Sequence, residues 1–86
     1  MNQMNHTDEL MTILMEECAE LTVAASKIIR FGESKENLLR LQEEVGDVMC
    51  MLNLLHEYDF VSWVDVDQQA DRKYEKLKMF SDLELA

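Results

Sequence analysis

The sequence of 86 residues contains no proline and only two glycines, Gly32 and Gly46. Proline interrupts helices and glycine marks many turns, so their scarcity predicts long helices joined by few turns. No apolar run approaches the roughly 20 residues that a membrane-spanning helix needs. Residues 1–6 are polar and lack the apolar segment of a signal peptide. We therefore expect a cytoplasmic protein that does not enter a membrane.

Basic residues are also scarce in this chain. There are 8 lysines and arginines against 18 acidic residues, which gives a formal net charge of −10. This balance argues against a nucleic-acid partner, because nucleic-acid binding depends on neutralising phosphates. A smaller anionic ligand stays compatible with the sequence where metal ions cancel the acidic charge locally.

The sequence has two cysteines, Cys18 and Cys50, and both lie beside apolar residues. They form no Cys-x-x-Cys pattern and no cluster with histidine, which argues against a zinc site. We predict that both are reduced residues of the core.

Hydrophobic residues make up 48% of the chain, which is typical of a folded protein and argues against disorder. They recur at steps of three and four along three segments, as expected for amphipathic helices. We predict Thr7, Ser34 and Ser62 as the N-caps and Gly32 as the end of the first helix. The predicted helices cover about residues 8–31, 35 to 57 or 58, and 63–80. The apolar stripes of the first two are expected to contain Leu10, Leu14, Leu21, Ala24 and Ile28, and Leu41, Val45, Val48, Leu52 and Leu55.

The connection between the first two predicted helices is short, which favours an antiparallel hairpin. The expected fold class is all-α, with this hairpin followed by a third helix. We expect one domain over residues 1–86, with residues 1–6 and 81–86 as mobile ends. A chain of this length buries a limited share of its surface alone. We therefore expect a homo-oligomer to complete a core of the four-helix type.

Two pairs of acidic residues lie at the apolar faces of the first two predicted helices. Glu17 occupies a position that the apolar pattern reserves for a core residue, and Glu20 follows one turn later. Glu44 and Asp47 border the stripe of the second helix with the same spacing. Residues three apart on a helix are neighbours, and the two pairs lie at similar depths from the turn. The four carboxylates are therefore expected to converge.

Four convergent carboxylates without histidine or cysteine are typical of a site for Mg²⁺, with Mn²⁺ as a substitute. A carboxylate at an apolar face is unfavourable unless it is paired or bound to a cation. A Mg²⁺ ion polarises phosphoryl oxygens and activates water. The pattern therefore favours hydrolysis of a nucleoside triphosphate or a related phosphoanhydride.

The chain also resembles a known family. Residues 17–21 and 44–48 resemble the Glu-x-x-Glu and Glu-x-x-Asp motifs of the MazG-like all-α nucleotide pyrophosphohydrolases. Residues 71–74 resemble the later Asn-x-Lys-aromatic element of that family. The resemblance covers about residues 10–78. It implies a helical homodimer or homotetramer that uses Mg²⁺ to cleave an NTP or dNTP between the α and β phosphates, releasing a monophosphate and pyrophosphate.

The resemblance assigns roles to individual residues. Lys73 would contact a phosphate of the substrate. Asp71 stands where the family usually has asparagine, and an acid there repels phosphate unless it also meets the metal. Glu16 and Glu43 precede the implied ligands and are candidates for orienting a ligand or the attacking water. The implied metal ligands, which are also the implied catalytic residues, are Glu17, Glu20, Glu44 and Asp47.

Other interpretations use the same residues differently. A Glu-x-x-Glu pair is common on solvated helix faces. The protein is alternatively a non-catalytic acidic helical oligomer that binds a nucleotide or a protein partner, which Asp71 and the short chain favour. A di-iron bundle needs Glu-x-x-His, and Asn53 stands three residues before His56, which argues against it. The preferred base and sugar stay open.

Overall fold

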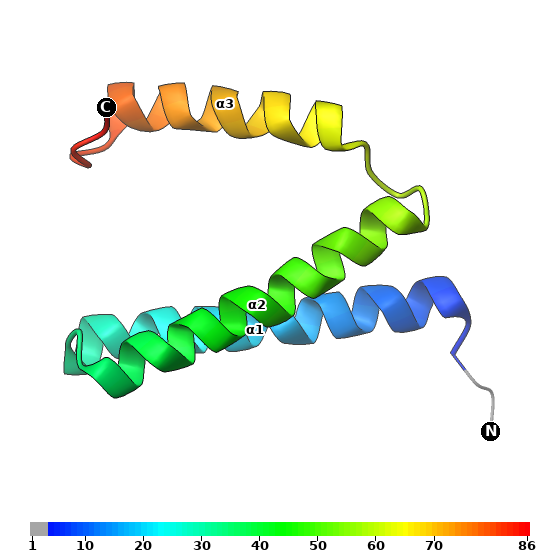
Figure 1. Ribbon diagram of the computed structural model, residues 1–86, viewed down its shortest axis with the longest axis horizontal. Helices are drawn as coiled ribbons and strands as arrows, with labels where there is room; N and C mark the ends of the chain where they lie inside the picture. Colours follow the sequence, from blue (N-terminus) through cyan, green and yellow to red (C-terminus); the bar gives the residue numbers. More distant parts are fainter. Residues whose placement is uncertain (1–3) are drawn as a thin grey trace. The chain divides into compact units, whose positions relative to one another are not determined.

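The computed structural model describes residues 4–86, and this part of the chain forms three α-helices and no strand (Figure 1). The predicted all-α class is therefore confirmed. The chain divides into two compact units, Met1–Leu54 and Leu55–Ala86. Of the expected mobile end at 1–6, residues 1–3 lie outside the described part. The helices are α1 (His6–Phe31), α2 (Lys35–Glu57) and α3 (Trp63–Phe80).

The N-terminal end of α1 has a different cap from the one predicted, whereas the C-terminal end lies where it was predicted. The helix begins at His6, and Asn5 caps it by accepting a 2.8 Å hydrogen bond from the backbone N–H of Asp8 at its Oδ1 atom. The prediction of Thr7 as N-cap is wrong. The cap is Asn5, two residues before Thr7, because its side chain accepts from a backbone N–H group of the first turn that has no partner within the helix. The helix ends at Phe31 as predicted, and Gly32 follows with φ of 94°, a value that residues with a side chain rarely adopt.

The connection to α2 is short and closed by hydrogen bonds. The backbone N–H of Asn37 donates to Ser34 Oγ at 3.1 Å, which confirms Ser34 as the cap of α2. The side-chain amide of Asn37 donates to the carbonyl oxygen of Gly32, also at 3.1 Å. The chain reverses here, and α1 and α2 lie side by side as an antiparallel hairpin (Figure 1). The hairpin prediction is confirmed.

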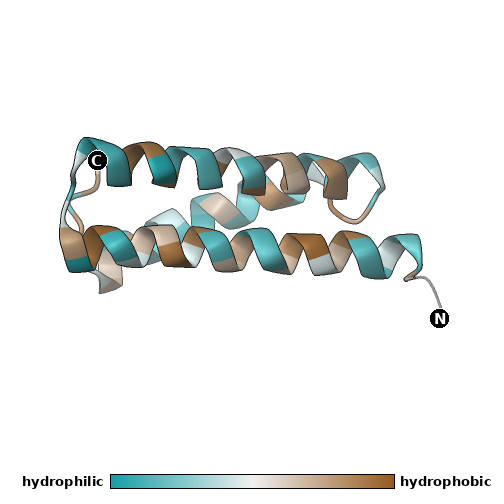
Figure 2. Cartoon of the chain, turned by 90° about the horizontal axis from the view of Figure 1, so that it is seen from below, coloured by the Kyte–Doolittle hydropathy of each residue, from teal (hydrophilic) through white to brown (hydrophobic). Residues whose placement is uncertain are grey.

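The least exposed face of α2 matches the predicted stripe except at one position, where Glu44 is buried in place of Val45. Val45 was expected inside, yet it is 47% exposed, while Glu44 is 2% exposed. Apolar and polar residues alternate along the helices (Figure 2). On α1 the predicted stripe holds, because Leu10 and Ala24 are buried. The buried face of α2 contains Leu41, Glu44, Val48 and Met51 among its buried and half-buried residues.

The cysteines do not lie in the core. Cys18 and Cys50 are exposed free thiols, so the prediction of burial is wrong. Cys18 follows Glu17, which lies on the less exposed face of α1, and Cys50 precedes Met51, which lies on the less exposed face of α2. One step along a helix turns the side chain by about 100°, which carries both thiols off those faces.

The second unit contains α3 and the turn that precedes it. The backbone N–H groups of Asp59 and Phe60 donate to the carbonyls of His56 (3.1 Å) and Leu55 (2.8 Å), which is the hydrogen-bond pattern of a Schellman motif. Asp59 supplies the left-handed residue, with φ of 64°. Ser62 is the N-cap of α3, but its side chain makes no capping hydrogen bond, so it caps through backbone conformation alone.

Replacing Gly46 by alanine is expected to stabilise the protein. A Cβ atom at this mid-helix position would meet no heavy atom within 4 Å, so glycine is not needed for close packing or for space near the acidic residues. Alanine loses less backbone entropy on folding, and the expected gain in free energy of unfolding is about 0.5–1 kcal/mol. Urea unfolding followed by circular dichroism measures it. A loss of stability would show that another molecule packs against the Cα of Gly46.

Candidate metal centre

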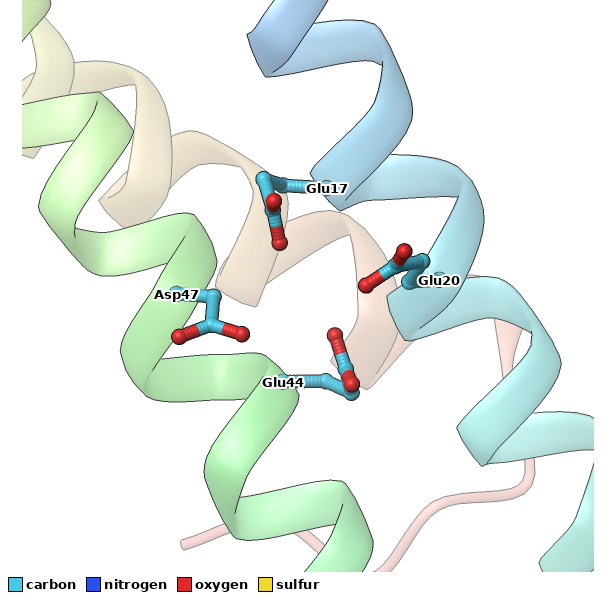
Figure 3. Close-up of side chains that lie close together, drawn as sticks. All are labelled: Glu17, Glu20, Glu44 and Asp47. Carbon is cyan, nitrogen blue, oxygen red and sulfur yellow. The ribbon is translucent and has the colours of Figure 1, made fainter.

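Four acidic side chains from the hairpin point toward one another (Figure 3). Glu17 and Glu20 come from consecutive turns of α1, and Glu44 and Asp47 come from the facing turns of α2. One carboxylate oxygen from each residue lies within 4.8 Å of the other three. The expected convergence of the two pairs is therefore present. Their role as metal ligands stays a prediction.

The cluster has a buried wall and an open side. Glu44 is the most enclosed residue, with 2% of its surface exposed, and Glu17 is half-buried. Within residues 4–86, the Oε2 atoms of both are inaccessible to solvent and have no hydrogen-bond partner. Glu20 and Asp47 are exposed. A ligand can therefore reach the cluster from the side of Glu20 and Asp47.

Burial and mutual repulsion raise the pKa values of the two deeper carboxylates, those of Glu17 and Glu44. Burial raises the pKa of Glu44, the Arg40 guanidinium opposes this, and the charges of Glu20 and Asp47 raise it further. Burial also raises the pKa of Glu17, with Glu20 and Asp47 as the next causes. The two groups are thus poorly compensated as anions, and a cation between them would relieve both effects.

Arg40 is a member of this site that the sequence interpretation overlooked. Its Nη2 atom lies 2.9 Å from Glu44 Oε1, and its Nη1 atom lies 3.6 Å from Glu43 Oε2. The ion pair takes up one oxygen of Glu44 and leaves Oε2 without a partner. The available signal was the spacing of four between Arg40 and Glu44, because such residues are neighbours on a helix.

The residues named by the MazG resemblance outside the cluster are all exposed. Asp71 and Lys73 lie on α3, in the second unit, so the cluster as described includes neither. Glu43 points its carboxylate to Arg40 rather than toward the other four carboxylates. Glu16 acts on the cluster through its charge, which is a minor cause of the raised pKa of Glu17.

The donor set fits a hard divalent cation. It offers carboxylate oxygens alone, at least two of them buried and unpartnered, with no thiolate or imidazole among the clustered residues. Such oxygen ligands suit Mg²⁺ and Mn²⁺ better than Zn²⁺ or copper. A solvated surface pair does not explain the 2% exposure of Glu44.

Comparisons with protein-family models, curated proteins and solved structures find no match for this chain. The described helices include none that is both long and apolar enough to cross a bilayer. The geometry of the cluster and the motif resemblance are therefore the observations that bear on function.

Proposed function

We propose that this protein is a Mg²⁺-dependent nucleotide pyrophosphohydrolase of the MazG-like type. It would hydrolyse an NTP or dNTP between the α and β phosphates to a monophosphate and pyrophosphate. The observation that carries the proposal is the enclosed, unpartnered Oε2 atom of Glu44 within a group of four carboxylates on facing helices. A buried carboxylate oxygen without a partner is unfavourable, and a bound divalent cation removes that penalty. The motif resemblance supports the choice of reaction.

The four carboxylates have distinct tasks in this proposal. Glu17 and Glu44, the enclosed pair, would hold the metal ion together with Glu20 and Asp47, which are exposed to solvent. When bound, Mg²⁺, or Mn²⁺ as a substitute, supplies positive charge that stabilises the phosphoryl transition state and activates water. The exposed side leaves room for the phosphates of the substrate. Lys73 is proposed to contact a phosphate.

The proposal includes a cytoplasmic homodimer or homotetramer. Large apolar side chains are exposed on α3, including Val64 (66%), Met79 (73%) and Phe80 (80%), and α3 has no buried residue. A helix with such a surface gains stability when a further helix covers it. Sedimentation equilibrium tests this point, and a monomer at micromolar concentration would contradict it.

The deciding experiment measures pyrophosphate release from a panel of NTPs and dNTPs with Mg²⁺ or Mn²⁺. We expect release from one or a few nucleotides by the natural protein and by Glu33→Gln, which removes an exposed charge in the hairpin turn. Glu44→Gln is expected to show no release above background. Release of single phosphate would contradict the assigned bond. Silence across the panel, with nucleotide still bound, would favour the non-catalytic module.

A further inference from the structure

Two open pockets lie on the first unit, and the smaller one includes Glu20 of the acidic cluster. The smaller, of about 220 Å³, lies between α1 and α2 and is lined by Glu20, Lys27 and Arg40 together with small and apolar side chains. The larger, of about 600 Å³, shares Lys27 and Arg40 with it and adds Lys35. Its acidic lining residues are Glu36 and Glu43. The pockets therefore meet at Lys27 and Arg40.

Charge is distributed unevenly around these pockets. The Met1–Leu54 unit contains ten acidic residues and four basic ones, by count along the sequence. Three of those four basic residues, Lys27, Lys35 and Arg40, line the pockets, and each pocket has one more basic than acidic residue. A positively charged recess beside a cation site suits a ligand that carries both negative charge and affinity for the cation, which describes a phosphate chain.

Arg40 belongs to both the pocket and the cluster. Its side chain is 54% exposed and reaches Glu44 from the pocket side, with 2.9 Å between Nη2 and Oε1. Its guanidinium is the positive charge that pairs with the buried carboxylate of Glu44. A divalent cation bound by Glu44 would repel the guanidinium of Arg40 and would itself balance the negative charge of Glu44. The guanidinium could then bind a ligand in the pocket that Arg40 already lines.

We propose that Arg40 is an exchangeable counter-ion of the metal site, which leaves Glu44 when a divalent cation binds and then, together with Lys27, holds a phosphate chain in the adjoining pocket. The choice of ligand rests on the proposed function. Metal binding would thereby strengthen phosphate binding, since the guanidinium of Arg40 becomes available to a phosphate only when it no longer pairs with Glu44. Neither residue was assigned a role by the MazG resemblance.

The test compares Arg40→Met with the natural protein in two binding measurements. Mn²⁺ affinity is read from the electron paramagnetic resonance signal of the free ion, and inorganic pyrophosphate affinity in excess Mn²⁺ is read by calorimetry. Arg40→Met is expected to tighten Mn²⁺ binding about two- to fivefold, the range of an exposed ion pair. It is expected to weaken pyrophosphate binding about tenfold or more, as for a lost hydrogen bond to a charged group.

Two further variants make the result specific. Lys27→Met should weaken pyrophosphate binding without changing Mn²⁺ affinity. Arg30→Met removes the one basic residue of this unit that lines neither pocket, and should change neither affinity. If Arg40→Met weakened both ligands, Arg40 would be a structural support of Glu44 and the proposal would fail. Unchanged pyrophosphate affinity in Arg40→Met would equally overturn it.

The test of the Arg40 exchange is independent of the test of nucleotide hydrolysis, because it measures the binding of Mn²⁺ and pyrophosphate and not turnover. Opposite changes in Mn²⁺ and pyrophosphate affinity, in a protein that hydrolyses no nucleotide, would support the exchange and reject the enzyme. Nucleotide hydrolysis with an unchanged pyrophosphate affinity in Arg40→Met would support the enzyme and reject the exchange. Arg40→Lys, which keeps the charge, should give intermediate pyrophosphate binding and covers the case in which Arg40→Met does not fold.

Discussion

Replacement of Glu44 by glutamine is expected to lower Mn²⁺ affinity by on the order of 100-fold or more, since loss of residues that only support metal ligands already costs 10- to 100-fold. Glutamine keeps the shape of the side chain and removes its charge. Glu44 is the deepest of the four carboxylates, and one of its oxygens has no partner. Titration calorimetry with Mn²⁺ measures the loss, and the exposed Glu33→Gln should bind the metal normally.

The same substitution should not unfold the metal-free protein at neutral pH. Burial and the neighbouring Glu20 and Asp47 raise the pKa of Glu44, so removing its negative charge relieves an unfavourable burial. A neutral amide is free of that repulsion, although Arg40 loses its partner at 2.9 Å. Helical circular dichroism is therefore expected to persist in Glu44→Gln. A variant that bound Mn²⁺ as tightly as the natural protein would show that the cluster is not the metal site.

The helices were predictable from the sequence because each carries a local signal. Steps of three and four between apolar residues fix the extent of all three helices, and Gly32 and Ser34 fix the hairpin between two of them. Asn5 was missed as a cap because Thr7 is also a capping residue type, and only the backbone path decides between them. Burial of Cys18 and Cys50 was wrong because neighbours in sequence lie on different helix faces.

The four carboxylates of the candidate site were predictable for the same reason. Two pairs with a spacing of three, at similar depths in a hairpin, come close together when the hairpin forms. The degree of burial was not predictable, since the apolar pattern placed Val45 inside the stripe and Glu44, its neighbour in sequence, at the border. The structure buries Glu44 and exposes Val45. The pockets at Lys27 and Arg40 depend on the distance and orientation of two helices, which residue spacing does not specify.

Divalent cations are expected to stabilise the folded protein strongly. A ligand that binds only the folded state at 100 times its dissociation constant adds about 2.7 kcal/mol to the free energy of unfolding. For a domain of this size, that corresponds to a rise in melting temperature of roughly 10–20 °C. Thermal unfolding with Mn²⁺ or Mg²⁺, against NaCl of matched ionic strength, measures the effect. The salt control is needed because screening of the net charge of −10 also stabilises the chain.

The stability of the metal-free protein and the additional stability given by a divalent cation should change with pH in opposite directions. The pKa values of Glu17 and Glu44 are raised above their ordinary value of 4.5, so the folded metal-free protein holds protons that the unfolded chain has released. Their contribution to stability is therefore fully present below the ordinary pKa and is lost as the pH rises through the raised values. Cations must displace those protons, so the gain from Mn²⁺ should grow over the same pH range.

Urea unfolding of the metal-free and Mn²⁺-loaded protein across mildly acidic to mildly alkaline pH tests this linkage. The metal-free curve should decline with pH, and the difference between the two curves should widen. In Glu44→Gln the part of the decline due to Glu44 is absent and the difference nearly vanishes, because the buried proton site and the buried ligand are the same carboxylate. A difference that stayed constant with pH would mean that the cation binds at carboxylates of ordinary pKa, away from the hairpin cluster.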